Sequence, residues 1–434
     1  MSQREIQPGS LPERLPRQPA RQGAVLLGLA LVAVVGCEAS PSGEERSAKA
    51  RPSALPSRAG APAAAPSIQA ATAFLVSSCD AQGRFVYRLH VEDPGDQSEG
   101  DYNVLRHAGA LYALDQAWRA QQDPSVAAAL RRGARYLVRH HLRPVVGKPG
   151  LRVIASRTGE EVAQSTAKLG GAGLGLVALC AAHSLDPELV SLEDLRGLAR
   201  FVLWAQRPDG SFRAKFFLER DAWSSFVSLY YPGEAILGLV RLYALDPDPA
   251  WLTAAARAAA FLARSRRDLS PSKLPHDHWL LIAGGELLPR WGELQQAPAP
   301  RAEVRLHLDR LASLFLAVQA EIAAAGRYPG SFHASGAVCP SATRVEGLVG
   351  YASLSGVASA EAPSRAKLLA GIQLGARFLE RAQLLEDPRL CGAFPRGLVE
   401  TSDEPLRQRG EVRVDFTQHS LSALLGAARL SARD

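Results

Sequence analysis

Cysteine is scarce in this sequence. The 434 residues contain five cysteines, and no two of them form a C-x-x-C pair. A thiolate zinc site normally needs such closely spaced cysteines, so the spacing argues against one. Cys339 and Cys391 lie in loop-like sequence and are the best candidates for a disulfide, which an oxidising compartment would permit. Cys180 stands in an apolar stretch and is expected to be a buried thiol.

No apolar run is long enough to span a bilayer, which needs about 20 residues. The run at 24–35 has about 12 residues, follows three arginines, and ends in Val34-Val35-Gly36-Cys37. This pattern resembles a bacterial lipoprotein signal peptide, whose cysteine is lipidated and becomes the mature N-terminus. The resemblance implies that residues 1–36 are removed and that Cys37 carries lipid. An ordinary signal peptide with an accidental cysteine is the alternative.

The segment after Cys37 also lacks the residues that build a core. Residues 37–66 are rich in Ala, Pro, Ser, Gly and charges, and are expected to be a disordered tether. The globular part is therefore expected at 67–434. Glu38 after the cysteine favours the outer membrane, so the expected location is exported and lipid-anchored, facing the periplasm or at the outer membrane.

No block of Lys and Arg interleaved with aromatics is present, which argues against a nucleic-acid partner. Loss of residues 1–36, with four Arg and two Glu, lowers the formal charge from +7 to +5. An acidic partner such as an anionic glycan remains open. No phosphate-binding or dinucleotide glycine loop is recognised, and the glycines of "KLGGAGLGL" indicate close helix packing, so no cofactor is expected.

What the sequence does have is helical periodicity over most of its length. The only convincing strands, "RFVYRLH" and "LRVIAS", are short and isolated. About twelve helices are predicted, at 67–78, 103–121, 124–140, 165–184, 191–206, 231–245, 249–266, 276–288, 301–325, 344–358, 364–385 and 417–432.

An internal repeat organises these helices. Residues 108–137 align without a gap on 233–262, and the Asp-Pro pair of the first copy falls on that of the second. Aspartate caps a helix and proline fits its first position, so each copy is expected to be a helix, a turn and a second helix. A Gly-x-Phe triplet also recurs at 83–85, 210–212, 330–332 and 392–394 and is interpreted as a packing signature.

Twelve helices make six hairpins, which predicts an all-α fold of the α/α-toroid type, with inner helices ringed by outer ones and a few short strands at the mouth. An inner helix packs on all sides and should be apolar all round, as 167–182 and 233–245 are. The segment 191–206 is amphipathic and fits an outer helix. A two-domain helical solenoid is the alternative.

In such a toroid the segments that lead into the inner helices gather at one mouth. Polar and aromatic residues recur at this point of six successive units, in "DYNVLRHAG", "QSTAKLGG", "YYPGEA", "HDHW", "TRVEGL" and "RVDFTQHS". Helix capping and the helix dipole explain some of them, such as Asp277, Glu234 and Glu346. The remainder predicts a shared functional site.

The overall pattern resembles the six-hairpin α/α-toroid superfamily, which includes glycoside hydrolases, polysaccharide lyases and the C-terminal domain of D-glucuronyl C5-epimerases. The resemblance covers most of 67–434, but no single motif matches one family. It implies an enzyme that acts on carbohydrate.

Hydrolysis of a glycoside needs two carboxyl groups, whereas a lyase or epimerase removes a proton beside a carboxylate with Tyr or His while Arg or Lys neutralises the acid. The candidate catalytic residues are Glu234, Asp277, His278, Glu346 and Asp415. The candidate substrate-binding residues are Tyr102, Arg106, His107, Lys168, Tyr230, Tyr231, Trp279, Arg344, Gln418 and His419. No metal is expected, because His276 and His278, two residues apart, would not share a helix face.

Glu234 has a separate argument. The repeat aligns it with Gly109, so the fold itself does not require an acid there. Tyr230 and Tyr231 would shield its carboxyl group from water and raise its pKa, which suits a general acid.

The sequence thus predicts an exported, membrane-anchored toroid that acts on a carbohydrate polymer as a hydrolase, a lyase or an epimerase. Its expected partners are a glycan or another envelope polymer, and the membrane through the lipid anchor. The alternative is a non-catalytic toroid that binds a glycan or a protein of the cell envelope.

Overall fold

The structure is a computed structural model that describes residues 65–93, 102–156, 165–354, 358–399 and 407–432. The expected signal peptide, nearly all of the expected tether, and Cys37 lie outside these residues. Within them, no helix combines the length and the apolar character that a membrane span requires.

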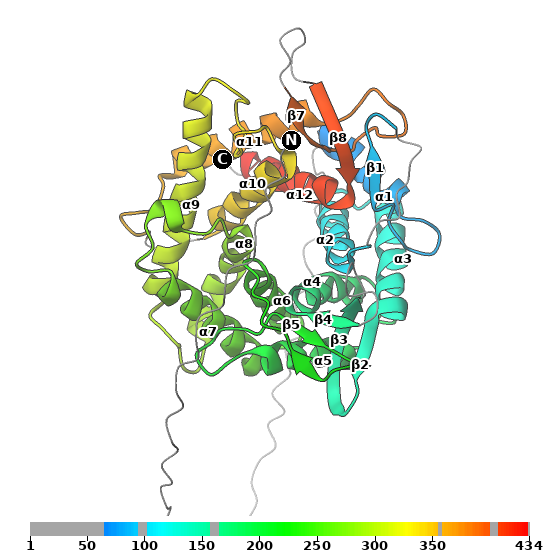
Figure 1. The fold of residues 1–434 in the computed structure, drawn as a ribbon, viewed down its shortest axis with the longest axis vertical. Coiled ribbons are helices and arrows are strands. Elements are labelled where there is room, and N and C mark those ends of the chain that lie inside the picture. The colour runs from blue at the N-terminus through cyan, green and yellow to red at the C-terminus, as the bar shows by residue number, and fades with distance from the viewer. Residues whose placement is uncertain (1–64, 94–101, 157–164, 355–357, 400–406, 433–434) are drawn as a thin grey trace, which may run out of the picture. The chain divides into compact units, whose positions relative to one another are not determined.

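Twelve α-helices are described, and alternate ones close into a ring. The inner helices are α2 (Val104–Gln121), α4 (Leu169–Leu185), α6 (Tyr231–Leu245), α8 (His278–Leu287), α10 (Val338–Ala352) and α12 (Val414–Ser431). Each contacts the next, and α12 returns to contact α2. Figure 1 shows this ring face-on, and the toroid prediction is confirmed.

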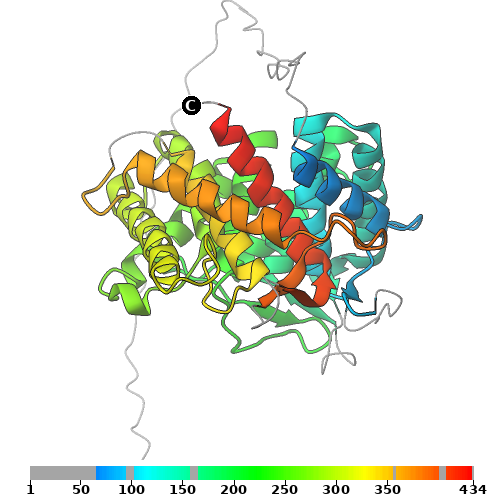
Figure 2. The ribbon, with the colours of Figure 1, turned by 90° about the horizontal axis from the view of Figure 1, so that it is seen from above.

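The other six helices lie outside the ring. They are α1 (Pro66–Ser78), α3 (Pro124–His141), α5 (Leu192–Ala205), α7 (Pro249–Ser265), α9 (Arg301–Ala324) and α11 (Arg365–Ala382). Figure 2 shows α11 crossing the outside of the ring beside α12. As expected, α4 is buried almost throughout, whereas α5 buries only one side. Two short 3-10 helices flank α8: η2 (Pro271–Lys273) lies before it and η3 (Leu288–Glu293) follows it directly.

The strands form two antiparallel sheets, so the expectation of isolated strands was wrong. One sheet has the order β1 (Arg88–His90), β8 (Arg407–Arg413), β7 (Pro395–Val399). The other has the order β2 (Leu142–Val145), β3 (Lys148–Ser156), β4 (Thr166–Lys168), β5 (Lys215–Phe217), β6 (Ala222–Trp223). β4 runs directly into α4 and β8 directly into α12, so the sheets fix where these two inner helices begin.

The repeat is confirmed as two helical hairpins, α2–α3 and α6–α7, with α4–α5 between them. Asp123 accepts a hydrogen bond from Ser125 N, and Asp248 accepts one from Ala250 N, each as the N-cap of the second helix of its hairpin. The Asp-Pro pairs therefore stop one helix and start the next, as the sequence predicts.

The Gly-x-Phe triplets mark tight packing against outer helices. Gly83 and Gly210 both have positive φ. A Cβ atom on Gly83 would lie 2.1 Å from the carbonyl oxygen of Arg132, and a Cβ atom on Gly210 would lie 2.5 Å from that of Arg257. These two arginines are equivalent in the repeat. Only glycine allows both the φ value and the close approach, which supports the interpretation as a packing signature.

Several helix boundaries differ from the prediction: α10 ends at Ala352 rather than 358, α11 ends at Ala382 rather than 385, and α12 begins at Val414 rather than 417. α10 begins at Val338 rather than 344, because Pro340 fits in its first turn, where an N–H is not needed. α4 begins at Leu169, because 166–168 are taken up in β4. The expected Cys339–Cys391 disulfide is not formed, and the four described cysteines are free thiols, with Cys180 buried as predicted.

Candidate active site

The start of α8 is held by a buried ion pair. Asp277 is the N-cap, and its Oδ1 accepts a hydrogen bond from Leu280 N at 3.1 Å. Its Oδ2 lies 2.8 Å from Nη1 of Arg266, and both side chains are buried. Because both oxygens are engaged, Asp277 fixes the position of His278, the first residue of α8.

The imidazole of His278 is surrounded by rings. It meets Tyr230 edge-to-face at 5.1 Å between centroids, Trp279 at 5.2 Å and His419 at 5.6 Å. Its Nε2 is buried and has no hydrogen-bond partner among the described residues. Burial, and then the nearby charges of His419 and Arg344, hold the pKa of His278 well below 6.5, so the ring is neutral at neutral pH.

The start of α12 is held in a similar way. Asp415 binds Arg413 through two contacts, of 2.6 Å and 3.0 Å, and lies 3.1 Å from Nε of Arg106 on α2. Arg106 also donates a hydrogen bond to the hydroxyl of Tyr87. The charge of Asp415 is therefore compensated by two arginines, and the ion pairs tie α12 to α2.

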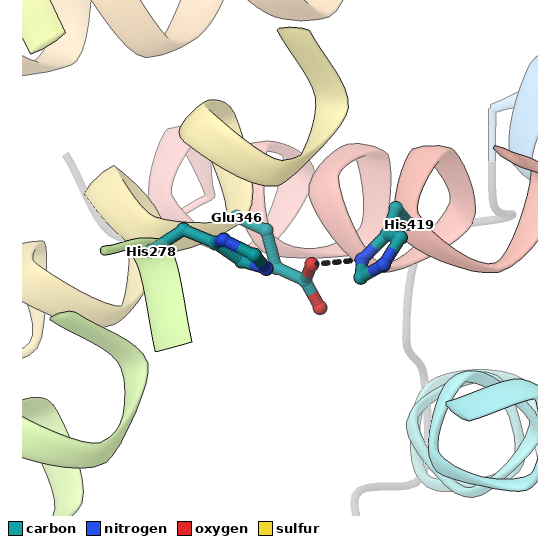
Figure 3. Close-up of side chains that lie close together, drawn as sticks. All are labelled: His278, Glu346 and His419. Carbon is teal, nitrogen blue, oxygen red and sulfur yellow. Dashed lines mark hydrogen bonds and ion pairs between the residues drawn. The ribbon is translucent and has the colours of Figure 1, made fainter. Parts of the chain in front are cut away.

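Glu346 connects the second histidine to α10. Nδ1 of His419 lies 2.7 Å from Oε2 of Glu346, and Gln418 Nε2 lies 3.2 Å from the same ring nitrogen. Figure 3 shows the Glu346 carboxylate between the rings of His278 and His419. We call these three buried residues, which come from α8, α10 and α12, the histidine–glutamate cluster.

The cluster also meets the composition of a metal site. One ligand atom from each of the three residues lies within 4.8 Å of the others. Two ligands of a tetrahedral zinc ion, each about 2.0–2.1 Å from the metal, lie about 3.3 Å apart. The 2.7 Å contact between His419 and Glu346 is shorter and has the length of a hydrogen bond. The described geometry is that of a proton-sharing pair. His276 lies outside this cluster, as expected, and contacts Arg344.

Glu234 is buried at the start of α6. A Cβ added at Gly170 of α4 would lie 2.1 Å from its Oε2 and 2.4 Å from the ring of Tyr231, so the missing side chain at Gly170 makes room for both. The Oε2 atom of Glu234 has no hydrogen-bond partner among the described residues. Burial, helped by the charge of Asp277, raises the pKa of Glu234 to about 8.

Arg344 lies in the second turn of α10. It donates hydrogen bonds to the carbonyl oxygen of Pro340 and to Nδ1 of His276, both at 2.7 Å. Its charge acts on Tyr230 and on His278. Tyr230 is 41% exposed, whereas the three members of the histidine–glutamate cluster are buried, so Tyr230 is the part of this group that solvent reaches most easily.

Two predicted site residues lie elsewhere. The Tyr102 hydroxyl contacts His107 Nδ1 at 2.7 Å and accepts a hydrogen bond from Phe85 N at 3.1 Å. His107 Nε2 reaches the carbonyl oxygen of Gly133 on α3 at 2.9 Å, and burial lowers the pKa of His107 to about 4. The pair packs α2 against α3 and does not join the histidine–glutamate cluster.

Two further candidates are Lys168 and Trp279. Lys168 is the last residue of β4 and the N-cap of α4. Trp279 is buried and contacts the rings of His278, His419 and Tyr112. Tyr112, Arg266 and Arg413 were not predicted to be near the site. Of these, only Arg413 carried a signal in the sequence, since it stands two residues before Asp415.

A shallow cavity of about 390 Å³ lies away from these residues. It is lined by Val240, Ala244, Glu286, Pro289, Arg290 and Glu293, towards the opposite ends of α6 and α8. Glu286 is already paired with Arg241 at 2.8 Å, and no buried, unpaired group is among the lining residues. The candidate catalytic residues lie on the other side of the ring, towards the starts of the inner helices.

Comparisons with known proteins identify the fold. No protein-family model matches the chain, and no curated protein sequence matches it. The structure is similar to a sugar epimerase from a ruminal bacterium, with a TM-score of 0.59 and 13% identity over 83% of this chain and 96% of that one. It is also similar to a D-mannose isomerase (TM-score 0.57, 12% identity, 84% and 96% covered). A third similar structure is a family 76 α-mannanase from Bacteroides thetaiotaomicron (TM-score 0.54, 12% identity, 85% and 96% covered).

Proposed function

We propose that this protein is a sugar isomerase or epimerase, in which His278 and His419 move a proton at a carbon beside a carbonyl group. The observation that carries the proposal is the histidine–glutamate cluster, where two imidazoles from different inner helices lie 5.6 Å apart with a carboxylate between them. Solved structures of the same fold include, by their names, a sugar epimerase and a D-mannose isomerase, which supports a sugar as substrate.

The surroundings of the two rings suit opposite roles. His278 has no acidic hydrogen-bond partner and is kept neutral by burial, so it has a lone pair available as a base. His419 is held by Glu346 through Nδ1 at 2.7 Å, which leaves its Nε2 to give a proton to the substrate, so we assign His419 as the acid. Two titratable groups whose environments differ in this way are the usual arrangement for acid–base catalysis.

The proposed step needs no redox partner. His278 accepts the proton that leaves carbon, and the electron pair of that C–H bond moves into the carbonyl group, which becomes an enolate or enediolate. A proton from His419 then returns to the substrate, at the same carbon in an epimerase or at the neighbouring carbon in an isomerase. In an epimerase the sugar loses and regains one carbon-bound proton. In an isomerase the neighbouring hydroxyl group also gives its proton to the former carbonyl oxygen. The two histidines exchange roles for the reverse reaction.

Glycoside hydrolysis has less support. It requires two carboxyl groups on opposite sides of the scissile bond. Asp277 and Asp415 are each held by arginines, and Glu346 is bonded to His419. Glu234 has the raised pKa of a general acid, but its carboxyl group is closed in beneath Tyr231 and Gly170.

The proposal is tested by hydrogen exchange with solvent. The protein is incubated in D2O with a panel of neutral and acidic sugars, and proton NMR follows both the loss of the signal beside the carbonyl group and the appearance of a new isomer. His278→Asn and His419→Asn should each lower the exchange rate by about 10²-fold or more. The control is His140→Asn, which changes an exposed histidine on the outer helix α3.

Exchange that survives in both variants would rule out the acid–base pair. Binding of a glycan without exchange of any sugar on the panel would instead favour the non-catalytic toroid. A lyase would release an unsaturated product, which absorbs ultraviolet light, and a hydrolase would release a new reducing end without exchange.

We further propose that the protein is exported and anchored to a membrane by lipid on Cys37. The support is the lipobox-like Val34-Val35-Gly36-Cys37 behind a short apolar run. Cells that express the full chain are labelled with a fatty-acid probe. The wild type should take up label and fractionate with membranes, and Cys37→Ser should do neither. Unchanged labelling of Cys37→Ser would contradict the anchor without touching the enzymatic proposal.

A further inference from the structure

Arg344 is a largely buried cation that has no acidic partner among the described residues. Its two hydrogen bonds go to neutral acceptors, Pro340 O and His276 Nδ1. Its Nε is buried and has no partner among the described residues. Burial lowers the pKa of Arg344, and among the described residues Tyr230 and Cys339 counteract this, neither of which is a carboxylic acid.

The other half-buried arginines of the inner helices are paired with carboxylates. Arg106 lies 3.1 Å from Asp415, and Arg241 lies 2.8 Å from Glu286. Behind the ring, the buried Arg266 lies 2.8 Å from Asp277 and the buried Arg305 lies 2.6 Å from Asp309. Proteins normally pair such charges, because removing an ion from water costs several kcal/mol when no opposite charge compensates it. An arginine that departs from this rule beside a candidate active site is expected to have its partner in a ligand.

The position of Arg344 links it to the proposed chemistry. Its charge acts on His278 and on Tyr230, and the Tyr230 ring meets the edge of His278 at 5.1 Å. The guanidinium has five N–H groups, of which two donate to Pro340 and His276. The remaining N–H groups are enough to bind both oxygens of a carboxylate, which is the pairing that arginine geometry favours.

We infer that the substrate is an acidic sugar, a uronate, and that Arg344 binds its carboxylate while His278 and His419 act on the carbon that carries this group. The inference rests on the proposed function and narrows it to epimerisation beside a carboxylate. When the proton leaves that carbon, negative charge builds up on a group that is already an anion. A fixed guanidinium stabilises this extra charge, which is the main obstacle to the reaction.

The inference is tested first by binding, in the full-length protein. Isothermal titration calorimetry compares D-glucuronate, D-galacturonate and D-mannuronate with D-glucose, D-galactose and D-mannose. The wild type should bind at least one uronate more tightly than the matching neutral sugar. Arg344→Gln should weaken uronate binding about 10- to 100-fold and leave neutral-sugar binding within about twofold, since a charge-assisted pair is lost only for the acid. Arg344→Lys should restore part of the loss, because it keeps the charge but not the two-pronged geometry.

Arg377→Gln is the matched control. It removes the same charge from an exposed position on the outer helix α11 and should change neither kind of binding. Thermal unfolding of the ligand-free variants separates a binding role from a structural one. Arg344→Gln should melt at the wild-type temperature or above it, because an uncompensated buried charge has been removed. A clear fall in melting temperature would assign Arg344 to the fold and overturn the inference.

The two proposals fail in different ways. One outcome is that neutral sugars exchange in D2O as fast as uronates and that Arg344→Gln leaves uronate binding unchanged. This would contradict the proposal of an acidic substrate, but it would be consistent with proton transfer by His278 and His419. Arg344-dependent binding of a uronate without exchange at its carbon would keep the anion site and overturn the enzyme. Failure of every uronate to bind would also overturn the inference.

Discussion

Towards the C-terminal ends of the inner helices, buried charge is matched. Arg241 of α6 pairs with Glu286 of α8 at 2.8 Å, lies 3.9 Å from Asp115 of α2, and stands over the ring of Tyr112 at 5.0 Å. Asp115 is further bonded to Arg119 at 2.9 Å. At the start of α6 and α8 and near the middle of α10, buried atoms of four charged or titratable groups have no hydrogen-bond partner among the described residues: Glu234 Oε2, His278 Nε2, Arg344 Nε and Glu346 Oε1. We call this side of the ring its N-terminal end.

The difference shows where stability and function lie in one scaffold. A satisfied buried network contributes to the fold, because breaking it leaves a desolvated charge unpaired. Unsatisfied buried groups cost stability, and they persist where a ligand or a reaction uses them. If the N-terminal end is the ligand site that we propose, the opposite end of the ring is the structural one, and variants that remove a charge at each end should have opposite effects on stability.

The largest effect is expected at the structural end. Arg241→Met should lower the free energy of unfolding by about 3 kcal/mol, because both Asp115 and Glu286 would lose a cationic partner. The larger part of the loss comes from Asp115, which is buried, since Glu286 is partly exposed to water. Arg344→Met, the same truncation at the other end, should leave the stability unchanged or raise it. Urea unfolding at pH 7 measures both, and equal losses in the two variants would break the comparison.

Glu234 provides the next test. Folded, its carboxyl group keeps its proton up to a pKa of about 8, whereas the unfolded chain loses it near 4.5. The stability that this group contributes is therefore fully present below pH 4.5 and is lost as the pH rises towards 8. Glu234→Gln is neutral at every pH and should exceed the wild type by about 3 kcal/mol at pH 7, with the difference falling below about 0.5 kcal/mol at pH 4.5. Thermal melts of the two proteins across this range provide the measurement, and a difference that is constant with pH would show that Glu234 is ionised in the fold.

Features that depend on local spacing were predictable from the sequence, whereas contacts between distant segments were not. The helices, the hairpin repeat and the Asp-Pro turns depend on local spacing, so the predicted boundaries of α2, α3, α6 and α7 agree with the structure within one residue or so. The sheets were missed as sheets because β1 pairs with β8 across the whole chain, and such pairing leaves no local pattern. Arg241, at the structural end, was not singled out, because its partners Glu286 and Asp115 belong to other helices.

For the site, spacing identified which residues begin the inner helices but not the direction in which each side chain points. His278, Glu346 and His419 were predicted together with Tyr102 and His107, and only the structure separates the cluster from the pair that packs on α3. Arg266 was missed because its role depends on the buried ion pair with Asp277, which arises only when α7 packs behind the start of α8.

A smaller effect concerns the titration of His278. Burial, followed by the nearby charges of His419 and Arg344, keeps the pKa of its imidazole well below 6.5, so the ring should stay neutral from pH 8 to pH 6. Two-dimensional NMR of the histidine rings, with His278→Asn for assignment, follows its signal. A His278 resonance that shifts between pH 6 and pH 7 would remove the neutral base from the proposed mechanism.

The smallest expected effect is that of removing metal. The cluster of His278, Glu346 and His419 has the composition of a metal site, but its 2.7 Å contact between His419 and Glu346 has the length of a hydrogen bond. A metal could enter only by displacing that shared proton and moving the two ligands apart. EDTA should therefore change neither the melting temperature nor the exchange of sugar protons, and Zn²⁺ or Co²⁺ should raise the melting temperature by less than about 1 °C, because weak binding adds little stability. Loss of exchange in EDTA, restored by one of these ions in the wild type but not in Glu346→Gln, would show instead that Glu346 is a ligand and that the groups without partners at this end await a cation.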